Sequence, residues 1–324
     1  MQAIVQDRYG SPDVLRVEEV GKPTIAGHEV LVRVRAASVN ARDWHVMRGD
    51  PYLARLVFGL TRPKMRIRGT DFAGVVEAVG ENVKRFAPGD EVFGEVEGAF
   101  AEYVAAPEDL VARMPSNVTF EQASALPLAA NTALMGLRDA ARVQPGHKVL
   151  INGASGGVGT FAVQMAKVFG AEVTGVCSTR NVDLVGSLGA DHVVDYTRAD
   201  FAKAGARYDV VFDLVGNRTL KDMRSVLTAE GALILSGGGM SEGGSLVGPM
   251  GLIVKGQVVS RLARQKMLVL TAKAGRENLE ALAELTGSGK ITSAIDRTYA
   301  FDEAPEAIRH LEVEHARAKV VITL

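Results

Sequence analysis

A cluster of glycines constrains the fold more than any other feature of the sequence. It lies in the stretch INGASGGVGTFAVQMAKVFG (residues 151–170), between a strand-like run and a helix-like run. The apolar run 148–152 predicts a buried strand, and apolar residues at three- and four-residue spacing after the glycines predict a helix. Glycines in this strand–turn–helix setting are typical of a dinucleotide-binding site.

The glycine spacing is Ala154-x-Gly156-x-x-Gly159, with Gly153 directly before it. We expect Gly156 to let the backbone approach a pyrophosphate and Gly159 to let the helix pack closely on the strand. Free N–H groups at the start of the helix would then face the phosphates. The predicted cofactor contacts in this turn are Ala154, Ser155, Gly156, Gly157, Val158 and Gly159.

The segment after the next strand has no carboxylate where an NAD-binding unit usually offers one to the ribose. From Val173 through Val182 the chain contains no Asp or Glu. Directly after the strand, residues 178–181 offer two hydroxyls, a guanidinium and an amide, and the hydroxyls and the guanidinium suit a dianionic 2′-phosphate. The predicted cofactor is therefore NADPH, held here by Ser178, Thr179, Arg180 and Asn181. The alternative is that Arg180 begins a helix and faces solvent.

The pattern of apolar residues differs between two parts of the chain. The first 120 residues read as short strands separated by turns, because apolar residues such as Val30, Val32 and Val34 alternate with Arg33 and Arg35. After about residue 116 strand-like and helix-like runs alternate, which predicts a parallel sheet covered by helices on both faces. Alternating strands return at the C-terminus. We predict an α/β protein with a β-rich domain from residues 1–122 and 296–324, and a doubly wound Rossmann domain from residues 123–295.

Composition excludes several classes of partner. The 324 residues carry 37 basic and 38 acidic side chains, so the net charge of -1 gives no field for nucleic acid or an anionic membrane. We read the first residues as a strand rather than a leader, and Lys255 and Arg261 interrupt the most apolar late segment. We expect a cytoplasmic protein with small-molecule partners. Cys177 is the only cysteine, which excludes an intrachain disulfide and a cysteine-rich zinc lobe.

Several motifs together resemble one family from end to end. They are AASVNARDWHVMRG, GTDFAGVVEAVGENVKRFAPGDEV, LPLAANTALMGL, GASGGVGTFAVQMAKVFGAEV, SLGADHVVDY and HARAKVVI. The chain resembles the medium-chain dehydrogenase/reductase superfamily, and within it the zinc-independent quinone oxidoreductases related to zeta-crystallin. The resemblance implies a GroES-like domain, a Rossmann domain and a cleft holding NADPH. It also implies reduction of quinones or activated double bonds, and a homodimer.

The resemblance extends the set of predicted cofactor contacts. Thr132 matches a position near the nicotinamide ribose, Tyr196 a residue beside the 2′-phosphate, and Lys319 a lysine near the cofactor. Further positions lie at predicted strand ends, where backbone groups meet a dinucleotide. These are Val215, Gly216, Ser236, Gly237 and Leu270.

Zinc is not expected, because the positions of the zinc ligands hold other residues. Where zinc alcohol dehydrogenases carry Cys and a His-Glu pair, this chain has Asn40 and Thr70-Asp71, and Asn and Thr are poor zinc ligands. Without zinc, hydrogen bonds must polarise the acceptor, or the acceptor must need little help, as a quinone or an α,β-unsaturated carbonyl does. Asn40 is the predicted catalytic donor, unless it only caps a turn, and Tyr52 is a second candidate that could stack on or donate to the acceptor.

The sequence is also compatible with other interpretations. The chain could be a non-catalytic NADPH-binding protein, or a zinc-type alcohol dehydrogenase with atypical ligands. The basic residues at positions 62–68 could form a solvated loop or could bind an anionic tail of the substrate.

Overall fold

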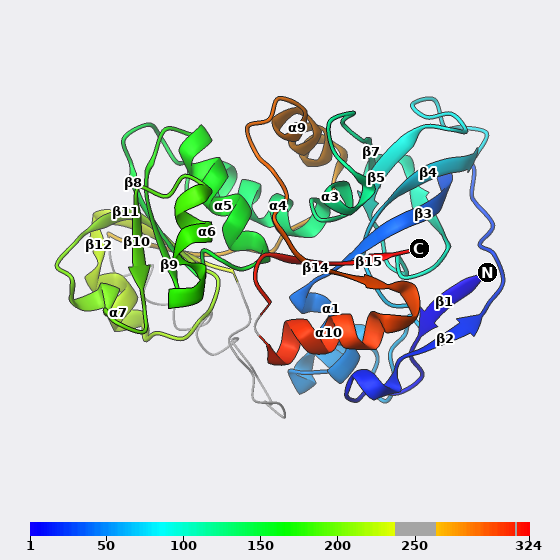
Figure 1. Cartoon of the computed structure of the whole chain (residues 1–324), viewed down its shortest axis with the longest axis horizontal. Coiled ribbons are helices and arrows are strands. Elements are labelled where there is room, and N and C mark those ends of the chain that lie inside the picture. Colours follow the sequence, from blue (N-terminus) through cyan, green and yellow to red (C-terminus); the bar gives the residue numbers. More distant parts are fainter. Residues whose placement is uncertain (237–263, 315) are drawn as a thin grey trace. The chain divides into compact units, whose positions relative to one another are not determined.

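The computed structural model describes residues 1–236, 264–314 and 316–324 (Figure 1). Its contacts divide the chain into two compact units. The first contains Met1–Asn131 and Lys273–Leu324, and the second contains Thr132–Ala272. The first unit is therefore assembled from both chain ends, with the second inserted between them.

The first unit is built on a seven-stranded sheet. Six strands follow the order β14-β15-β3-β4-β5-β7, and β6 pairs with β3. All pairs are antiparallel except β14 with β15. The strands are β3 (Glu29–Val39), β4 (Asp71–Val79), β5 (Glu91–Glu95), β6 (Tyr103–Pro107), β7 (Val111–Arg113), β14 (Ile295–Ala300) and β15 (Lys319–Thr323). Two further strands, β1 (Gln2–Val5) and β2 (Arg16–Glu19), form a separate antiparallel pair.

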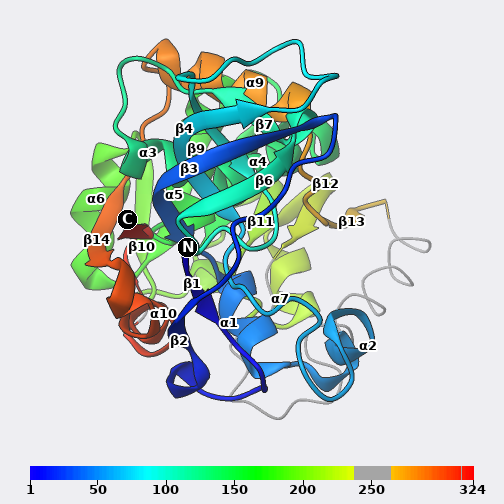
Figure 2. The same cartoon turned by 90° about the vertical axis from the view of Figure 1, so that its right-hand side faces the viewer.

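Side chains from both ends of the chain fill the core of this unit. Val30, Val32 and Val34 of β3 are buried and Arg33 and Arg35 are exposed, as their alternation predicts. Ile308 and Val320 from the C-terminal segment lie in the same apolar cluster as Phe72. Figure 2 shows the strands of this unit with α9 alongside β7.

The helices of the first unit are short. The α-helices are α1 (Ala41–Arg48), α2 (Arg55–Phe58), α3 (Phe120–Ser124), α9 (Arg276–Gly287) and α10 (Ala304–Val313), and α4 (Pro127–Leu134) runs across the boundary between the units. The 3-10 turns are η1 (Pro12–Val14), η2 (Tyr52–Ala54), η3 (Glu108–Leu110) and η7 (Phe301–Glu303).

The second unit is a doubly wound parallel sheet. Its strand order is β10-β9-β8-β11-β12-β13, which in chain order is 3-2-1-4-5-6. The strands are β8 (Lys148–Asn152), β9 (Glu172–Cys177), β10 (His192–Asp195), β11 (Tyr208–Asp213), β12 (Leu227–Leu235) and β13 (Lys266–Val269). The order reverses between β8 and β11, which is where dinucleotides bind in such sheets. The predicted fold class is confirmed.

Helices cover both faces of this sheet, because right-handed crossovers in opposite directions place them on opposite sides. Figure 1 shows α5 and α6 on one side of the strands and α7 on the other. The helical segments are η4 (Met135–Ala140, a π-helical turn), α5 (Gly157–Val168), η5 (Thr179–Asn181), α6 (Val182–Ser187), η6 (Phe201–Lys203) and α7 (Leu220–Ser225).

The boundaries of the second unit differ from those expected for the Rossmann domain. Residues 123–131 and 273–295, which we assigned to that domain, belong to the first unit. Asn117 Nδ2 donates to the Thr286 carbonyl at 3.1 Å, and Asn278 Nδ2 donates to Asn131 Oδ1 at 2.9 Å. The alternation of strand-like and helix-like runs does not reveal which sheet a helix packs on, so the sequence placed α9 with its neighbours in the chain.

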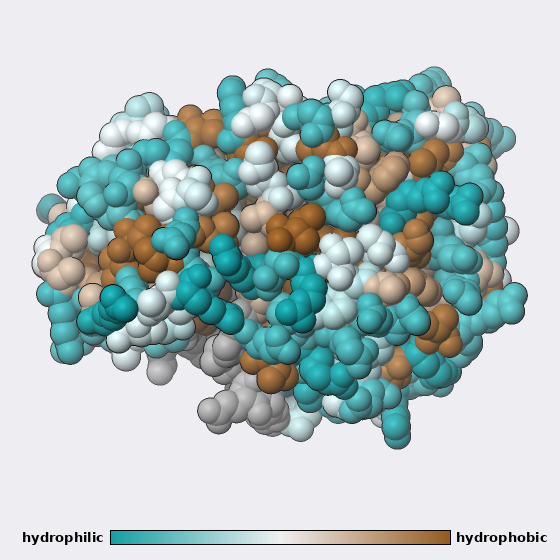
Figure 3. All heavy atoms as spheres, in the orientation of Figure 1, coloured by the Kyte–Doolittle hydropathy of each residue, from teal (hydrophilic) through white to brown (hydrophobic). Residues whose placement is uncertain are grey.

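Most large apolar side chains are buried, and the exposed ones cluster in one segment. Ten large hydrophobic side chains are exposed in the described part of the chain, and six of them lie between positions 52 and 65: Tyr52, Leu53, Leu56, Val57, Leu60 and Met65. On the face drawn in Figure 3, apolar side chains form separate patches among polar ones. Among the described residues, none of the helices has the length and apolar character needed to cross a membrane.

Candidate functional site

The glycine turn leaves open space beside the start of α5. Gly153 has a φ of +89°, in the left-handed region that favours glycine. Gly156 is the N-cap of α5, and a Cβ built on it would meet only the Gly153 carbonyl oxygen, at 3.5 Å. A Cβ on Gly159 would lie 2.1 Å from that same oxygen. The turn therefore needs Gly159 for its own packing, whereas Gly156 leaves room for a ligand beside the N–H groups of the first helical turn.

A buried carboxylate that the sequence did not single out organises the strand ends next to this turn. Asp213 ends β11, and its Oδ1 accepts hydrogen bonds from Asn152 Nδ2 at 2.9 Å and from the backbone N–H groups of Val215 (3.2 Å) and Gly216 (3.0 Å). Asp213 Oδ2 is buried without a protein partner among the described residues. This network fixes the loop after β11 at the reversal of strand order. The signal in the sequence is the Asp at the end of the apolar run YDVVFD.

Two further residues that we predict as cofactor contacts, Ser236 and Leu270, follow strands of this sheet, and their contact with a cofactor stays a prediction. The Ser236 N–H donates to the Asp213 carbonyl at 3.0 Å, and the Leu270 N–H donates to the Leu235 carbonyl at 3.0 Å. Both residues directly follow their strands at the carboxyl edge. Thr132 lies buried in α4. Gly237 lies outside the described residues.

The segment after β9 presents the predicted polar groups. Asn181 is buried, and its Nδ2 donates to Ser155 Oγ at 3.0 Å and to Ser178 Oγ at 3.3 Å. It thereby links the glycine turn to the segment predicted to hold the 2′-phosphate. Its Oδ1 is buried without a partner in the part of the chain that the structure describes. Arg180 lies within η5 and is exposed, and Tyr196 is 53% exposed.

A carboxylate does reach this segment, but from the neighbouring strand. Asp195 ends β10, and its Oδ2 accepts the Thr179 hydroxyl at 2.6 Å. Asp195 is not predicted from the sequence, because it lies outside the run that follows β9 and reaches that run only through strand pairing. The strand alignment of Asp195 opposite Cys177 brings the two segments together.

In the first unit, the predicted catalytic Asn40 sits between β3 and α1. Asn40 is the N-cap residue of α1, and its backbone N–H donates to Asp43 Oδ2 at 2.7 Å as part of a capping box. Asn40 Oδ1 accepts a hydrogen bond from Lys319 Nζ at 2.5 Å, while Nδ2 lies 3.5 Å from the Ser38 carbonyl. Lysine only donates, so the amide oxygen must face Lys319.

Lys319 is one of the largest side chains that are fully buried. Its Nζ also donates to the Val39 carbonyl at 3.2 Å and lies 4.0 Å from Asp71 Oδ2. Three oxygen neighbours suit the three donors of an ammonium. Asp71 in turn accepts hydrogen bonds from the Ser38 hydroxyl at 3.3 Å and from the Leu128 N–H at 3.2 Å. Contact of Lys319 with the cofactor stays a prediction.

Burial shifts the pKa values of the titratable groups around Asn40, which are Asp43, Asp71, Glu95 and Lys319. It raises the pKa of Asp43 to about 7 and that of Glu95 to about 8, and the pKa of Glu95 is also raised by the charge of Asp71. Burial likewise raises the pKa of Asp71 and lowers the pKa of Lys319, although each charge opposes the other's shift. Glu95 stands directly opposite Asp71 on adjacent strands. The cluster therefore keeps protons at neutral pH that exposed carboxyl groups would release.

Tyr52 lies in the segment rich in exposed apolar residues. The Arg55 guanidinium lies over its ring, 4.7 Å from the ring centroid, and the side chain is 45% exposed. These contacts do not bear on catalysis, so the catalytic role of Tyr52 stays a prediction.

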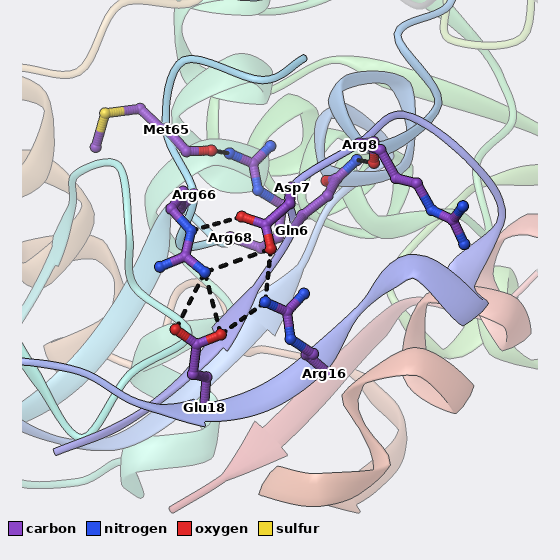
Figure 4. A network of polar contacts seen from close by, with 8 residues as sticks. All are labelled: Gln6, Asp7, Arg8, Arg16, Glu18, Met65, Arg66 and Arg68. Atoms are coloured by element: carbon purple, nitrogen blue, oxygen red, sulfur yellow. Dashed lines mark hydrogen bonds and ion pairs between the residues drawn. The ribbon is translucent and has the colours of Figure 1, made fainter.

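The basic residues at positions 62–68 divide into two groups. Figure 4 shows Arg66 against the carboxylates of Asp7 and Glu18, with Nε 2.6 Å from Asp7 and Nη2 3.1 Å from Glu18. Arg68 is buried and donates to the Met65 carbonyl. Arg62 and Lys64 are exposed. Two of the four cations thus serve the local structure, which leaves Arg62 and Lys64 as the pair of this loop that an anionic substrate could reach.

Metal-binding side chains do not gather in the described part of the chain. Across residues 1–236, 264–314 and 316–324, no three His, Cys, Asp or Glu side chains are arranged to hold a metal ion. Asn40 and Thr70, at the positions of zinc ligands in related enzymes, are engaged in hydrogen bonds with Lys319 and Asp71. Cys177 is buried, and burial raises the pKa of its thiol to about 11, which leaves it protonated at neutral pH.

Comparison with known proteins agrees with this architecture. Residues 26–116 match the alcohol dehydrogenase GroES-like domain and residues 188–322 match the zinc-binding dehydrogenase family. The 2-methylene-furan-3-one reductase of Solanum lycopersicum is 36% identical over 338 residues, which cover 99% of this chain and 79% of the reductase.

Two solved structures extend the comparison. The quinone oxidoreductase from Coxiella burnetii has a TM-score of 0.87 and 30% identity, with 100% of this chain and 99% of that one covered. The Escherichia coli quinone oxidoreductase complexed with NADPH has a TM-score of 0.83 and 26% identity, with 100% of both chains covered.

The fold and the glycine turn define a nucleotide-binding α/β protein with a β-rich unit assembled from both chain ends. The relatives narrow this class to one family. The chain belongs to the medium-chain dehydrogenase/reductase superfamily, in the group of the quinone oxidoreductases. It is an oxidoreductase of a family that binds a nicotinamide cofactor.

Proposed function

We propose that this protein is an NADPH-dependent reductase of quinones or α,β-unsaturated carbonyl compounds that works without a metal. The observation that carries the proposal is the glycine turn of the second unit, with Ser178, Arg180 and Tyr196 at the end of the adjoining strands. The names of the relatives support the acceptor class, since they include a quinone oxidoreductase and a 2-methylene-furan-3-one reductase.

The residues of the second unit fit a dinucleotide. Gly156 leaves the space in which a pyrophosphate can approach the backbone. Among the described residues, the buried oxygens Asn181 Oδ1 and Asp213 Oδ2 lack protein partners, so they can accept hydrogen bonds from ribose hydroxyls. Ser178 Oγ accepts from Asn181 Nδ2, which leaves its own hydrogen for a phosphate oxygen. Arg180 adds a cation that suits a phosphate dianion.

NADPH, when bound, supplies a hydride to an electron-poor atom of the acceptor, and one proton from the protein or solvent completes the reduction. The chain must bind the acceptor and favour the negative charge that develops on its oxygen. Asn40 suits that task. Lys319 donates a hydrogen bond to its amide oxygen, so the amide NH2 group is the donor that Asn40 can offer to an acceptor. The NH2 group lies 3.5 Å from the Ser38 carbonyl, and hydrogen bonding by the Asn40 side chain also lowers the pKa of Asp71, so an acceptor oxygen would compete with both of these oxygens for the NH2 group.

The buried carboxyl groups can supply the proton. Glu95, with a pKa of about 8, is protonated at neutral pH, and its Oε2 is buried without a protein partner in the described part of the chain. We assign it the role of a proton store within the cluster formed by Asn40, Asp43, Asp71, Glu95 and Lys319. No metal takes part in this scheme, so chelators should leave the activity unchanged.

The test is cofactor preference with a single quinone acceptor. The wild type should use NADPH about ten- to hundredfold more efficiently than NADH, because each charge-assisted hydrogen bond contributes about 1.5–3 kcal/mol and about 1.4 kcal/mol is a factor of ten. Arg180→Ala should raise the KM for NADPH and scarcely change that for NADH. Ser178→Asp should go further, because its carboxylate repels the phosphate. Equal use of both cofactors by the wild type, or equal weakening by Arg180→Ala, contradicts the 2′-phosphate assignment.

Two further expectations belong to this proposal. We expect a cytoplasmic homodimer, which light scattering and cell fractionation would test. A non-catalytic NADPH-binding protein would bind the cofactor and turn over neither a quinone nor an enone, so the same assay separates it from an enzyme.

A further inference from the structure

Asp195 lies beside the segment that we expect to hold the 2′-phosphate. It ends β10 opposite Cys177, the last residue of β9, and the next residue, Tyr196, donates its N–H to the Cys177 carbonyl at 3.0 Å. Ser178 and Thr179 come directly after Cys177. The fold thus brings a carboxylate into a region whose own sequence run contains none.

Asp195 is held as a carboxylate by three donors. Its Oδ2 accepts the Thr179 hydroxyl at 2.6 Å, and its Oδ1 accepts the Thr197 hydroxyl at 2.8 Å and the Thr197 N–H at 3.0 Å. The Thr179 hydroxyl is the largest cause of the lowered pKa of Asp195. These contacts fix both the position of the carboxylate and its negative charge at neutral pH.

This arrangement changes what Thr179 can offer. A hydroxyl has one hydrogen. That of Thr179 faces Asp195 Oδ2 at 2.6 Å, and the Thr179 oxygen also lies 2.9 Å from the Thr197 hydroxyl, so the group has no hydrogen left for a ligand. A phosphate dianion needs donors. The 2′-hydroxyl of an unphosphorylated ribose is itself a donor, and it can bond to a lone pair of the Thr179 oxygen.

We propose that Asp195 is a specificity-determining residue that limits the preference for a 2′-phosphate. It acts by its own negative charge and by withholding the Thr179 hydrogen. This inference rests on the proposed function, because it takes the segment after β9 as the ribose subsite. Arg198, whose Nε lies 3.5 Å from Asp195 Oδ2, moderates the effect but is 76% exposed, so water screens it.

The experiment measures binding rather than turnover. Isothermal titration gives the Kd of 2′,5′-ADP and of 5′-AMP for the wild type and for Asp195→Asn. The asparagine keeps an oxygen for the Thr179 hydroxyl and loses the charge. We expect the affinity ratio of 2′,5′-ADP to 5′-AMP to rise about three- to tenfold, since interactions of exposed charges are modest and the phosphate carries two. The rise should shrink at high salt.

The control is Asp183→Asn, which removes an equal charge from an exposed position of the adjacent α6. It should leave the ratio nearly unchanged. An unchanged ratio for Asp195→Asn, or an equal rise in the control, overturns the inference. A failure of the proposed function can be told apart from a failure of this inference. If Asp195→Asn shifts the affinity ratio but the wild type oxidises NADPH with neither a quinone nor an enone, only the proposed catalytic function is wrong.

Discussion

Replacement of Lys319 by Met tests whether the buried ion pair holds the first unit together. Methionine is unbranched and of nearly the same length, so it fills the space but removes the charge. Asp71 then stays fully buried, without the ammonium that lies 4.0 Å from its Oδ2. Unit charges about 4 Å apart interact by about 4 kcal/mol at an effective dielectric constant of about 20.

We therefore expect Lys319→Met to lower the free energy of unfolding by about 3–5 kcal/mol, the range for a buried pair that loses one partner. The loss should be larger at about pH 8 than at about pH 5, because Asp71, whose pKa burial already raises, can take up a proton at low pH. The double variant Lys319→Met/Asp71→Asn removes both charges. It should recover most of the lost stability, since the amide keeps hydrogen-bonding capacity in place of the carboxylate.

The assay can follow this unit alone. Trp44 is the only tryptophan of the chain and lies in α1 of the first unit, stacked on His45 at 3.8 Å between ring centroids. Its fluorescence in a urea titration reports unfolding of the unit that contains Lys319. A single variant within about 1 kcal/mol of the wild type, well below the loss expected for a broken buried pair, would refute the reasoning. So would a double variant no more stable than the single one.

Two further predictions concern the glycine turn and the buried proton. Gly159→Ala should destabilise the protein without cofactor by about 1–3 kcal/mol, because its Cβ would lie 2.1 Å from the Gly153 carbonyl oxygen. Gly156→Ala should leave the stability, measured by thermal unfolding, unchanged, and it should weaken NADPH binding in a fluorescence titration. Equal melting temperatures of the two variants would contradict the assigned roles. Glu95 keeps its proton up to about pH 8 in the folded protein, against a usual value of 4.5, so wild-type stability falls as pH rises between these values. The stability of Glu95→Gln relative to the wild type should therefore grow from about pH 5 to about pH 8, and a constant difference would argue against a buried proton.

The sequence predicted the features that depend on local pattern. The glycine turn, the alternating strands such as β3 and the parallel sheet each leave a periodic or positional signal in neighbouring residues. Asn181 was singled out by its place after β9, and the structure links it to Ser155 of the turn. Each of these predictions used only residues close to one another in the chain.

Features that depend on long-range contact were missed. Asp195 meets Thr179 only because β10 pairs with β9, and Lys319 meets Asn40 across 279 positions of the chain. The helix α9 returns to the first unit, although its sequence resembles the helices of the second. No local pattern records such pairings, so neither the domain boundary nor the buried charge cluster could be read from the sequence.

The most direct test of the central claim is the fate of deuterium from NADPH labelled at the transferable C4 position. The purified protein is incubated with labelled NADPH and an α,β-unsaturated ketone in the presence of a chelator, and the product is analysed by mass spectrometry and NMR. We predict acceptor-dependent oxidation of NADPH and a saturated ketone that carries the deuterium on its β-carbon. A product without deuterium, or activity that the chelator abolishes, would contradict metal-independent hydride transfer.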